Sequence, residues 1–351
     1  MWQAVTLKIN RLMKTNYYNV DPQYPNKNPI IQAAALISRG EMVVFPTETV
    51  YGLGANALDA EAVKKIFAAK GRPADNPLIV HVADKHWLEK VAQVNTLARE
   101  LINKFWPGPL TLILPKKDIV PKEVTAGLNT VAVRMPSHPV AQLLIKAAGV
   151  PIAAPSANSS GKPSSTQGQH ALDDLVGKVA MVLDAGPVPI GLESTILDVS
   201  KTPPVLLRPG YITKEDLLPI CKEIQDFKAN FTAKQTPPSP GLKYTHYAPA
   251  APVYLANEEG FFTIYEQLQK DYGNVAVLCS VEMLASSQKE LPLFKILGSR
   301  KNLQSIAQEL FAALRWCDQT EAKAVLVEIF PEEGIGLAIM DRLKRSAVVK
   351  G

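Results

Sequence analysis

The chain has 351 residues, which is more than one typical domain holds, so two domains are expected. Its 47% hydrophobic and 20% charged residues are typical of a soluble globular protein, and no apolar run reaches the roughly 18 to 20 residues needed to cross a bilayer. A net charge of +5 fits an anionic ligand but is too small to indicate a nucleic-acid-binding protein.

Two features favour a reducing cytoplasm. Residues 1–28, predicted to be an N-terminal extension, lack the apolar core of a signal peptide, and Met13 offers an alternative start. The three cysteines, Cys221, Cys279 and Cys317, are far apart and odd in number. That spacing argues against a disulfide framework and against a cysteine metal site.

Residues 29–225 read as a first domain of short apolar strands and helices. A helix over 59–71 is predicted to have Asp59 as its N-cap and Gly71 as its left-handed stop. Other helices are expected at 29–40, 95–105, 137–148 and 169–176. Strands are expected at 41–46, 77–82, 109–114, 129–135, 150–154, 179–184, 194–199 and 204–208. Because only some strands are joined through helices, we expect a mixed α/β sheet.

The composition changes in the stretch TAKQTPPSPGLKYTHYAPAAP, where five prolines exclude a helix or a central strand. We therefore predict a proline-rich linker over 226–251. Beyond it, residues 252–351 alternate regularly between strand and helix, and the helix at 301–317 has one apolar stripe. This alternation of strands and helices predicts a smaller, Rossmann-like α/β domain with a parallel sheet.

Several short stretches match functional motifs by sequence but are better explained as structural features. GLGANA (52–57) matches G-x-G-x-x-A, but five residues separate it from the preceding strand and no acidic strand end follows, so we interpret it as a glycine-rich turn. An NAD oxidoreductase is the alternative that this motif leaves open. The five histidines form no ligand pattern, and a metal held purely by protein side chains is not expected.

Loops that adjoin the apolar strands gather cations with serine, threonine and asparagine donors. The loop KGRPADNP (70–77) has two cations on a bend stiffened by two prolines, which a simple connector does not need. The cations of these loops are Lys70, Arg72, Arg134, Lys162 and Arg208. Each loop alone could be a solvated connection, but together at strand ends they would form an anion cradle. Such a cradle without a nucleophile suits phosphoryl or nucleotidyl transfer.

Seven stretches, in order, carry a resemblance to a known family. FPTETVYGLGANA, KGRPADNPLIVHV, WPGPLTLIL, VAVRMPSHP, APSANSSGKPSST, ESTILDV and LLRPG resemble the threonylcarbamoyl-AMP synthases of the YrdC type. The resemblance covers about residues 29–210. The stretches PSPGLKYTHYAPAAP and GIGLAIMDRLKRSA are similar to the longer, two-domain branch of that family.

The resemblance implies a nucleotidyltransferase that condenses L-threonine, bicarbonate or carbon dioxide, and ATP into threonylcarbamoyl-AMP and pyrophosphate. A partner transferase would then place the threonylcarbamoyl group on tRNA. Mg²⁺ is expected with the ATP, held mainly by phosphate oxygens and water. Such chemistry needs positioning and charge neutralisation rather than a covalent side chain.

The resemblance also implies the site residues. The signature set that grips the triphosphate corresponds to Lys70, Arg72, Ser156 and Asn158. Other positions expected to contact ATP are Asn76, Thr130, Ser164, Arg208 and Tyr244. Positions expected around the threonine are Thr49, His81, Arg134, Ala154 and Ser194. For His81, the interpretation from the strand alone is a satisfied core side chain.

Two further expectations concern the linker and an alternative function. We predict that the linker closes over the nucleotide as a lid with Gly241 as its hinge, because its prolines are interleaved with Lys243, Tyr244, His246 and Tyr247. A passive spacer is the alternative. An RNA-binding module is the other function class, although 7% aromatic residues and the lack of RNP-like strands count against base stacking.

Overall fold

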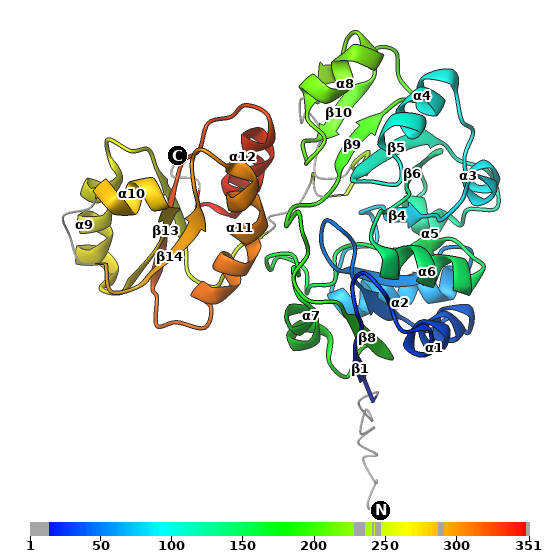
Figure 1. The fold of residues 1–351 in the computed structure, drawn as a ribbon, viewed down its shortest axis with the longest axis horizontal. Coiled ribbons are helices and arrows are strands. Elements are labelled where there is room, and N and C mark those ends of the chain that lie inside the picture. Colours follow the sequence, from blue (N-terminus) through cyan, green and yellow to red (C-terminus); the bar gives the residue numbers. More distant parts are fainter. Residues whose placement is uncertain (1–13, 228–235, 241, 243–246, 287–290, 349–351) are drawn as a thin grey trace, which may run out of the picture.

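The computed structural model describes residues 14–227, 236–240, 242, 247–286 and 291–348. Figure 1 shows two α/β units side by side, which we call the large domain (14–227) and the small domain (247–348). Within these described ranges, no helix has both the length and the apolar character needed to cross a membrane.

The large domain is built on an eleven-stranded mixed sheet with the order β1-β8-β2-β3-β7-β4-β6-β5-β9-β10-β11. Its strands are β1 (Asn16–Asn19), β2 (Val43–Phe45), β3 (Gly52–Asn56), β4 (Ile79–His81), β5 (Leu110–Pro115), β6 (Thr130–Arg134), β7 (Ile152–Ala153), β8 (Met181–Asp184), β9 (Thr195–Asp198), β10 (Val205–Arg208) and β11 (Gln225–Asp226). The sheet contains both parallel pairs such as β4–β6 and antiparallel pairs such as β5–β6. The predicted mixed sheet is confirmed.

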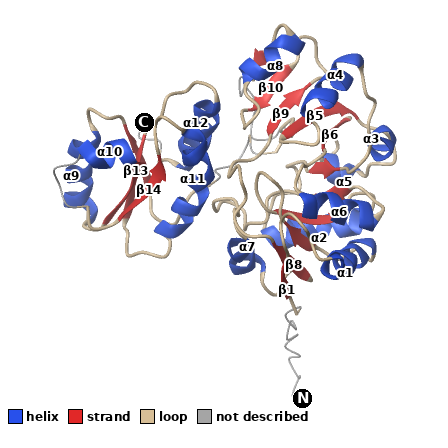
Figure 2. Ribbon diagram, viewed as in Figure 1, coloured by secondary structure: helices blue, strands red, loops and turns tan. Residues whose placement is uncertain are grey.

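Eight helices are assigned within residues 14–227, and Figure 2 shows them around the strands. They are α1 (Lys27–Ser38), α2 (Ala60–Lys70), α3 (Lys85–Val91), α4 (Thr96–Phe105), α5 (Lys122–Thr125), α6 (Pro139–Ala148), α7 (Gly168–Leu175) and α8 (Lys214–Cys221). The local signals of α2 are confirmed: the Asp59 carboxylate accepts from two backbone N–H groups of the first turn, and Gly71 has φ of 61°.

The glycine-rich turn predicted at 52–57 is wrong, because Gly52–Asn56 form strand β3 between β2 and β7. A Cβ atom on Gly54 would lie 2.7 Å from the Phe45 ring and 2.8 Å from the Ile152 side chain. The glycine therefore serves close packing inside a sheet rather than a turn.

The predicted N-terminal extension contributes to the sheet, because β1 pairs in parallel with β8. From β1, the Tyr17 hydroxyl donates a short hydrogen bond to the Asp184 carboxylate. Asp184 also accepts from the hydroxyl of Tyr51 at 2.7 Å. Burial and the neighbouring carboxylate raise the pKa of Tyr17 to about 12. Strands β1 and β8 thus fix the loop that carries Tyr51.

The small domain has four parallel strands in the order β12-β15-β13-β14, as the predicted second domain requires. They are β12 (Val253–Ala256), β13 (Val275–Ser280), β14 (Phe294–Gly298) and β15 (Ala324–Glu328), with helices α9 (Phe261–Tyr272), α10 (Val281–Ser286), α11 (Leu303–Cys317) and α12 (Ile335–Ser346). The predicted stripe of α11 is buried in the core at Ile306, Leu310 and Leu314.

Helices α11 and α12 lie on the side of the small domain that faces the large domain (Figure 1). Two loop residues of the large domain, Val50 and Leu192, belong to the same apolar cluster as the α11 stripe. At Gly191, φ is 82° and an added Cβ would lie 2.5 Å from the backbone of α11. The loops that precede β3 and β9 are therefore packed directly against the small domain.

Candidate functional site

A cavity lies in the large domain where strand ends and the loops beside them meet. Ten of the residues that the sequence singled out line it: Thr49, Lys70, Arg72, His81, Arg134, Ala154, Ser156, Asn158, Ser194 and Arg208. They come from segments spread between β2 and β10, so only the fold brings them together.

Lys70, at the end of α2, is buried. Its ammonium group donates to the backbone oxygens of Ser156, at 2.5 Å, and of Asn158. Burial, helped by the charge of Arg72, holds the pKa of Lys70 well below its ordinary value. Truncation of Lys70 should therefore disturb the fold, because two backbone carbonyl groups would lose their donor.

Arg72 is half-buried beside Lys70 and lies against its own loop. Its guanidinium donates to the backbone oxygen of Pro77 at 3.1 Å and, over a longer distance of 3.4 Å, to that of Asn76. The proline-stiffened bend thus holds the arginine side chain at the cavity wall. A planar guanidinium at that position suits an anionic ligand.

The loop after β7 supplies the amide and hydroxyl donors of the same wall. The Ser156 hydroxyl donates to the side-chain oxygen of Asn158 at 2.5 Å. The Asn158 amide nitrogen in turn donates to the backbone oxygens of Ser159 and Lys162, both at 2.9 Å. Asn158 therefore folds the loop on itself and sets the direction of Ser156.

Arg134 ends β6 in a buried position with several partners. Its guanidinium forms an ion pair with Glu48 at 2.7 Å and donates to the hydroxyl of Thr49 at 2.8 Å. Glu48 is buried as well, and Arg134 holds its pKa below the ordinary value against the effect of burial. Sequence reasoning missed Glu48, although it stands in the quoted stretch FPTETVYGLGANA; its signal was an acidic residue inside an apolar stretch.

His81 lies at the end of β4, next to Arg134 on β6. Its Nδ1 atom is 3.2 Å from the backbone oxygen of Ile79, which can only accept, so Nδ1 carries the proton and Nε2 is an acceptor. Burial and the charge of Arg134 lower the pKa of His81 to about 3. The imidazole is therefore neutral at physiological pH.

Ser194 and Arg208 also line the cavity and come from a later part of the chain than the Lys70 loop. The Arg208 guanidinium donates to the backbone oxygen and to the hydroxyl of Ser194, at 3.0 and 3.1 Å. The Ser194 hydroxyl also lies 2.7 Å from that of Thr111. Burial lowers the pKa of Arg208 to about 10, so the side chain stays cationic.

Glu193 is a further wall residue that sequence reasoning did not single out. One carboxylate oxygen accepts from the Ser164 hydroxyl at 2.6 Å, and the other pairs with Arg342 of α12 at 3.0 Å. The predicted ATP contact Ser164 thus stands behind Glu193 and is not among the residues that line the cavity. The nearest sequence signal was the acidic residue within ESTILDV.

Four other predicted residues do not line the cavity as described. Asn76 is buried, and neither polar atom of its side chain has a hydrogen-bond partner among the described residues. Thr130 starts β6, at the opposite strand end from Arg134. Lys162 points instead at Asp174, with 3.0 Å between the ammonium and the carboxylate. Tyr244 lies outside the described residues.

The linker reaches the cavity through Pro240 and Tyr247. Tyr247 has φ of 69°, and its ring packs against that of Phe311 on α11 with centroids 5.0 Å apart. The next residue, Ala248, donates its N–H to the backbone oxygen of Gly161 at 3.0 Å. The predicted hinge and lid residues Gly241, Lys243 and His246 lie outside the described residues.

The chain was compared with known proteins. A family model described as "Telomere recombination", of the Sua5/YciO/YrdC domain, matches residues 35–210, and one described as "Threonylcarbamoyl-AMP synthase, C-terminal domain" matches residues 212–348. The Bacillus subtilis protein named threonylcarbamoyl-AMP synthase is 47% identical, over 95% of this chain and 98% of that protein. The protein of the same name from Pyrococcus abyssi is 45% identical, over 90% and 93%.

Among solved structures, Pyrococcus abyssi Sua5 complexed with L-threonine matches with a TM-score of 0.88 and 43% identity, over 95% of this chain and 98% of that one. The match spans both domains. Together with the two family models, it shows that the chain belongs to the two-domain branch of the threonylcarbamoyl-AMP synthase family.

Proposed function

We propose that this cavity makes threonylcarbamoyl-AMP and pyrophosphate from L-threonine, bicarbonate or carbon dioxide, and ATP. The observation that carries the proposal is one cavity whose lining contains two unlike groups of residues, which we call its two ends. One end has a buried arginine with hydroxyl and imidazole acceptors, at Arg134, Thr49 and His81. The other has cations and loop donors, at Lys70, Arg72 and Ser156.

We assign L-threonine to the end formed by Thr49, His81, Arg134, Ala154 and Ser194. The Arg134 guanidinium suits the carboxylate of an amino acid, and its pairing with Glu48 holds it rigid before the ligand arrives. The neutral His81 offers Nε2 as an acceptor for the side-chain hydroxyl or the amine. With a pKa near 3, His81 is too weak a base to deprotonate the ammonium group efficiently.

We assign the triphosphate to the end that carries Lys70, Arg72, Ser156, Asn158 and Arg208. Lys70 acts mainly by holding the backbone of residues 156–158 in place, because its ammonium already serves two carbonyl oxygens. Arg72 and Arg208 supply positive charge at the wall. Asn76, Thr130, Ser164 and Tyr244 remain proposed ATP contacts on the family resemblance alone.

The reaction needs no covalent bond to the protein. The neutral threonine amine adds to carbon dioxide with release of a proton, or to bicarbonate with loss of water, and forms an N-carboxylate. An oxygen of that carboxylate attacks the α-phosphorus of ATP, the bond to the β-phosphate bridging oxygen breaks, and pyrophosphate leaves. The protein positions the two reactants and neutralises charge on the phosphates.

Mg²⁺ is proposed as the companion of ATP, where it would neutralise phosphate charge. The wall carboxylate Glu193 already uses both oxygens, on Ser164 and Arg342, and Glu48 is paired with Arg134. In the part of the chain that the structure describes, no group of three or more His, Cys, Asp or Glu side chains could hold a metal ion. The residues therefore fit a metal held by phosphate oxygens and water, without a dedicated protein ligand set.

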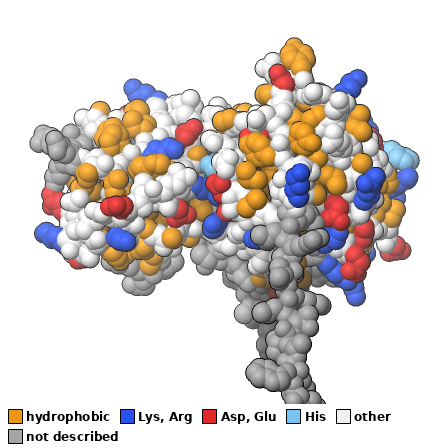
Figure 3. All heavy atoms as spheres, turned by 90° about the horizontal axis from the view of Figure 1, so that it is seen from below, with side chains coloured by type: hydrophobic (Ala, Val, Ile, Leu, Met, Phe, Trp, Pro, Cys, Tyr) orange, Lys and Arg blue, Asp and Glu red, His pale blue; other side chains and the backbone are white. Residues whose placement is uncertain are grey.

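The product would pass to a transferase that modifies tRNA, in the cytoplasm; tRNA is then an indirect end substrate. Direct RNA binding is the weaker function. On the face shown in Figure 3, lysine and arginine side chains are interspersed with acidic and apolar ones and form no basic stripe. Four of the five loop cations instead line the cavity: Lys70, Arg72, Arg134 and Arg208.

Pyrophosphate release by the full chain tests the proposal. We expect release from ATP and Mg²⁺ only when both L-threonine and bicarbonate are present, without any tRNA. Omission of either substrate is the matched control. Release that is independent of threonine, or strictly dependent on RNA, would contradict the proposed function.

A further inference from the structure

We propose that the small domain positions the catalytic cavity through two buried arginines, Arg315 on α11 and Arg342 on α12, which hold segments that carry some of the cavity's wall residues. We call this pair the arginine clamp. The inference rests on the proposed function, because it assigns the clamp a role in binding ATP at that same site.

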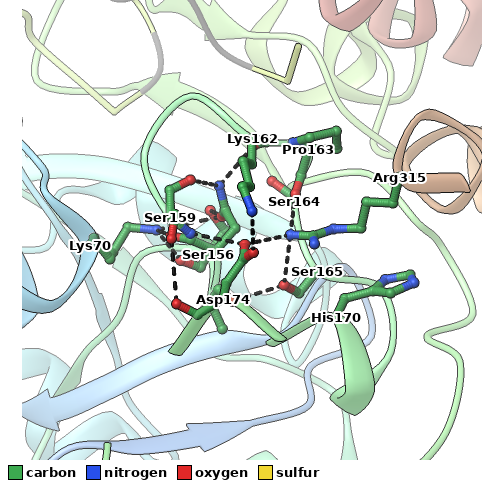
Figure 4. Close-up of polar contacts among 12 residues, drawn as sticks. Lys70, Ser156, Ser159, Lys162, Pro163, Ser164, Ser165, His170, Asp174 and Arg315 are labelled. Carbon is green, nitrogen blue, oxygen red and sulfur yellow. Dashed lines mark hydrogen bonds and ion pairs between the residues drawn. The ribbon is translucent and has the colours of Figure 1, made fainter. Parts of the chain in front are cut away.

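Arg315 reaches from the small domain into the loop after β7. Its guanidinium donates to the backbone oxygen of Pro163 at 2.7 Å and pairs with the Asp174 carboxylate at 2.8 Å. Figure 4 shows Lys162 and Arg315 both pointing at that carboxylate. Asp174 also accepts the backbone N–H of Ser159 at 3.0 Å. Arg315 therefore completes a network that fixes the loop just after Ser156 and Asn158.

Arg342 holds the other wall. Its side chain is fully buried, with Nε 3.0 Å from the Glu193 carboxylate and a terminal nitrogen 2.8 Å from the backbone oxygen of Pro209. Glu193 precedes Ser194 and Pro209 follows Arg208, so one guanidinium joins the segment before β9 to the segment after β10. It also pairs with its neighbour Asp341 at 2.9 Å.

The contact between Arg342 and Glu193 also compensates a negative charge, besides packing the small domain against the cavity wall. Glu193 lies on the cavity wall, where an unpaired carboxylate would repel a polyphosphate and compete for Arg208. Arg342 compensates this charge from the opposite side of the wall. Loss of Arg342 should therefore weaken ATP binding in particular, besides leaving a buried charge without its partner.

If Arg342 served only to stabilise the fold, removing the charge of Glu193 would not restore ATP binding. A double-mutant cycle of Arg342 and Glu193 therefore distinguishes a role in binding from a purely structural role. The cycle uses the full chain with Arg342→Met, Glu193→Gln and the double variant. Lys344→Met is the matched control, because it removes a positive charge from the same helix at an exposed pair with Glu332. For each protein, the Kd for ATP is measured by calorimetry, kcat and KM by pyrophosphate release, and Tm by thermal unfolding.

We expect Arg342→Met to raise the Kd and KM for ATP roughly 10- to 100-fold, a typical size for coupling between sites. Adding Glu193→Gln should recover most of the affinity, because the uncompensated charge is gone. Lys344→Met should leave Kd, KM and kcat unchanged. Arg315→Met should raise KM for ATP by disordering the loop at Ser156, and Arg315→Lys should restore part of the loss.

Two results would overturn the clamp. One is a folded Arg342→Met variant with the wild-type Kd for ATP; the other is a double variant no better than Arg342→Met. If Arg342→Met does not fold, Arg342→Lys is used in its place. Wild-type affinity for ATP in that folded variant would contradict a need for a guanidinium that contacts both Glu193 and Pro209. An increased KM for ATP would support it. Wild-type chain that fails to release pyrophosphate would instead contradict the proposed function, which separates the two failures.

Discussion

The two sheets of the chain both carry charged residues at strand ends, but they use them differently. In the small domain, Glu328 at the end of β15 is fully buried. It accepts the N–H of Ser280 at 2.7 Å and pairs closely with Arg300. Arg300 in turn pairs with Glu258. The charges at this edge thus satisfy one another and leave little to offer a ligand.

In the large domain, the charged residues at strand ends line the wall of a cavity or stand directly behind it. Arg134 is paired with Glu48 and still lines the cavity. Glu193 does the same with a partner from the other domain. Ligands of open α/β sheets bind at strand ends, but the comparison teaches that a strand-end position is insufficient. What matters is whether the ion-paired side chains still line a cavity that a ligand can enter.

Breaking one buried pair in each sheet should separate binding from stability. Arg134→Met and Arg300→Met each leave a buried glutamate without its partner, Glu48 or Glu328, which should cost about 3 to 5 kcal/mol of unfolding free energy. Only Arg134→Met should also lose binding of L-threonine, as measured by calorimetry on folded protein. Arg39→Met, at an exposed position, serves as control. Equal loss of threonine binding in both variants would refute the distinction.

Lys70→Ala should reduce activity and stability together. Loss of the fixed loop at Ser156 should remove about 2 to 4 kcal/mol of transition-state stabilisation. The two carbonyl oxygens left without a donor should lower the unfolding free energy by about 1 to 3 kcal/mol. Pyrophosphate release and thermal unfolding measure both effects, with the exposed Lys64→Ala on the same helix as control. Unchanged Tm in Lys70→Ala would contradict its buried role.

Arg72→Ala should be the counterpart that loses activity alone. Its side chain is half-buried and contacts backbone oxygens of its own bend, so truncation leaves a smaller defect than at Lys70. We expect a strongly raised KM for ATP with Tm close to that of the wild type. Wild-type turnover in this variant would count against a triphosphate site beside the bend.

Substrate selectivity sharpens the assignment of the threonine end. Valine lacks the hydroxyl that the polar wall at Thr49 and His81 would bind, so its use should leave buried polar groups unpaired and should be barely detectable. Serine keeps the hydroxyl and lacks one methyl group, which costs only about 1 to 3 kcal/mol. Competition assays with the three amino acids measure the ranking. Equal use of valine and threonine would contradict it.

The dependence of stability on pH should be a smaller effect with a defined sign. Folding lowers the pKa values of Asp174 and Glu193, so the stability from these carboxylates is present above their ordinary values of 3.8 and 4.5 and is lost as pH falls below them. Burial lowers the pKa of His170 to about 4, so the unfolded chain binds a proton first and stability falls as pH drops below about 6.5.

Thermal unfolding between pH 8 and 4 measures these slopes. His170→Gln should flatten the decline between pH 6.5 and 4, and the exposed His86→Gln should not. The buried His81, with its lowered pKa, should contribute to the decline that remains. A decline that His170→Gln leaves unchanged would show that His170 does not contribute to it.

Local signals in the sequence predicted much of the fold. The caps Asp59 and Gly71 act within a few residues of themselves, so they could be recognised without the structure. The turn predicted at Gly54 failed because the reason for that glycine is the ring of Phe45 on a neighbouring strand. The strand β1 was missed because its partner β8 is distant in the sequence.

The candidate site follows the same division. Motif resemblance predicted ten of the residues that line the cavity, but the ion pairs behind the wall remained hidden. Arg342 and Glu193 are 149 residues apart, and no local pattern joins them. Burial of Lys70 was equally hidden, because it depends on the loop after β7 folding over the end of α2.

Transfer of labelled carbon tests the central claim most directly. The wild-type chain is incubated with ATP, Mg²⁺, L-threonine and ¹³C-bicarbonate, and the adenylate product is examined by mass spectrometry. We predict threonylcarbamoyl-AMP that carries the label, formed together with pyrophosphate, and none when threonine is omitted. Formation of threonyl-AMP without the labelled carbon would contradict the account, because the cavity would then activate the amino acid's own carboxylate.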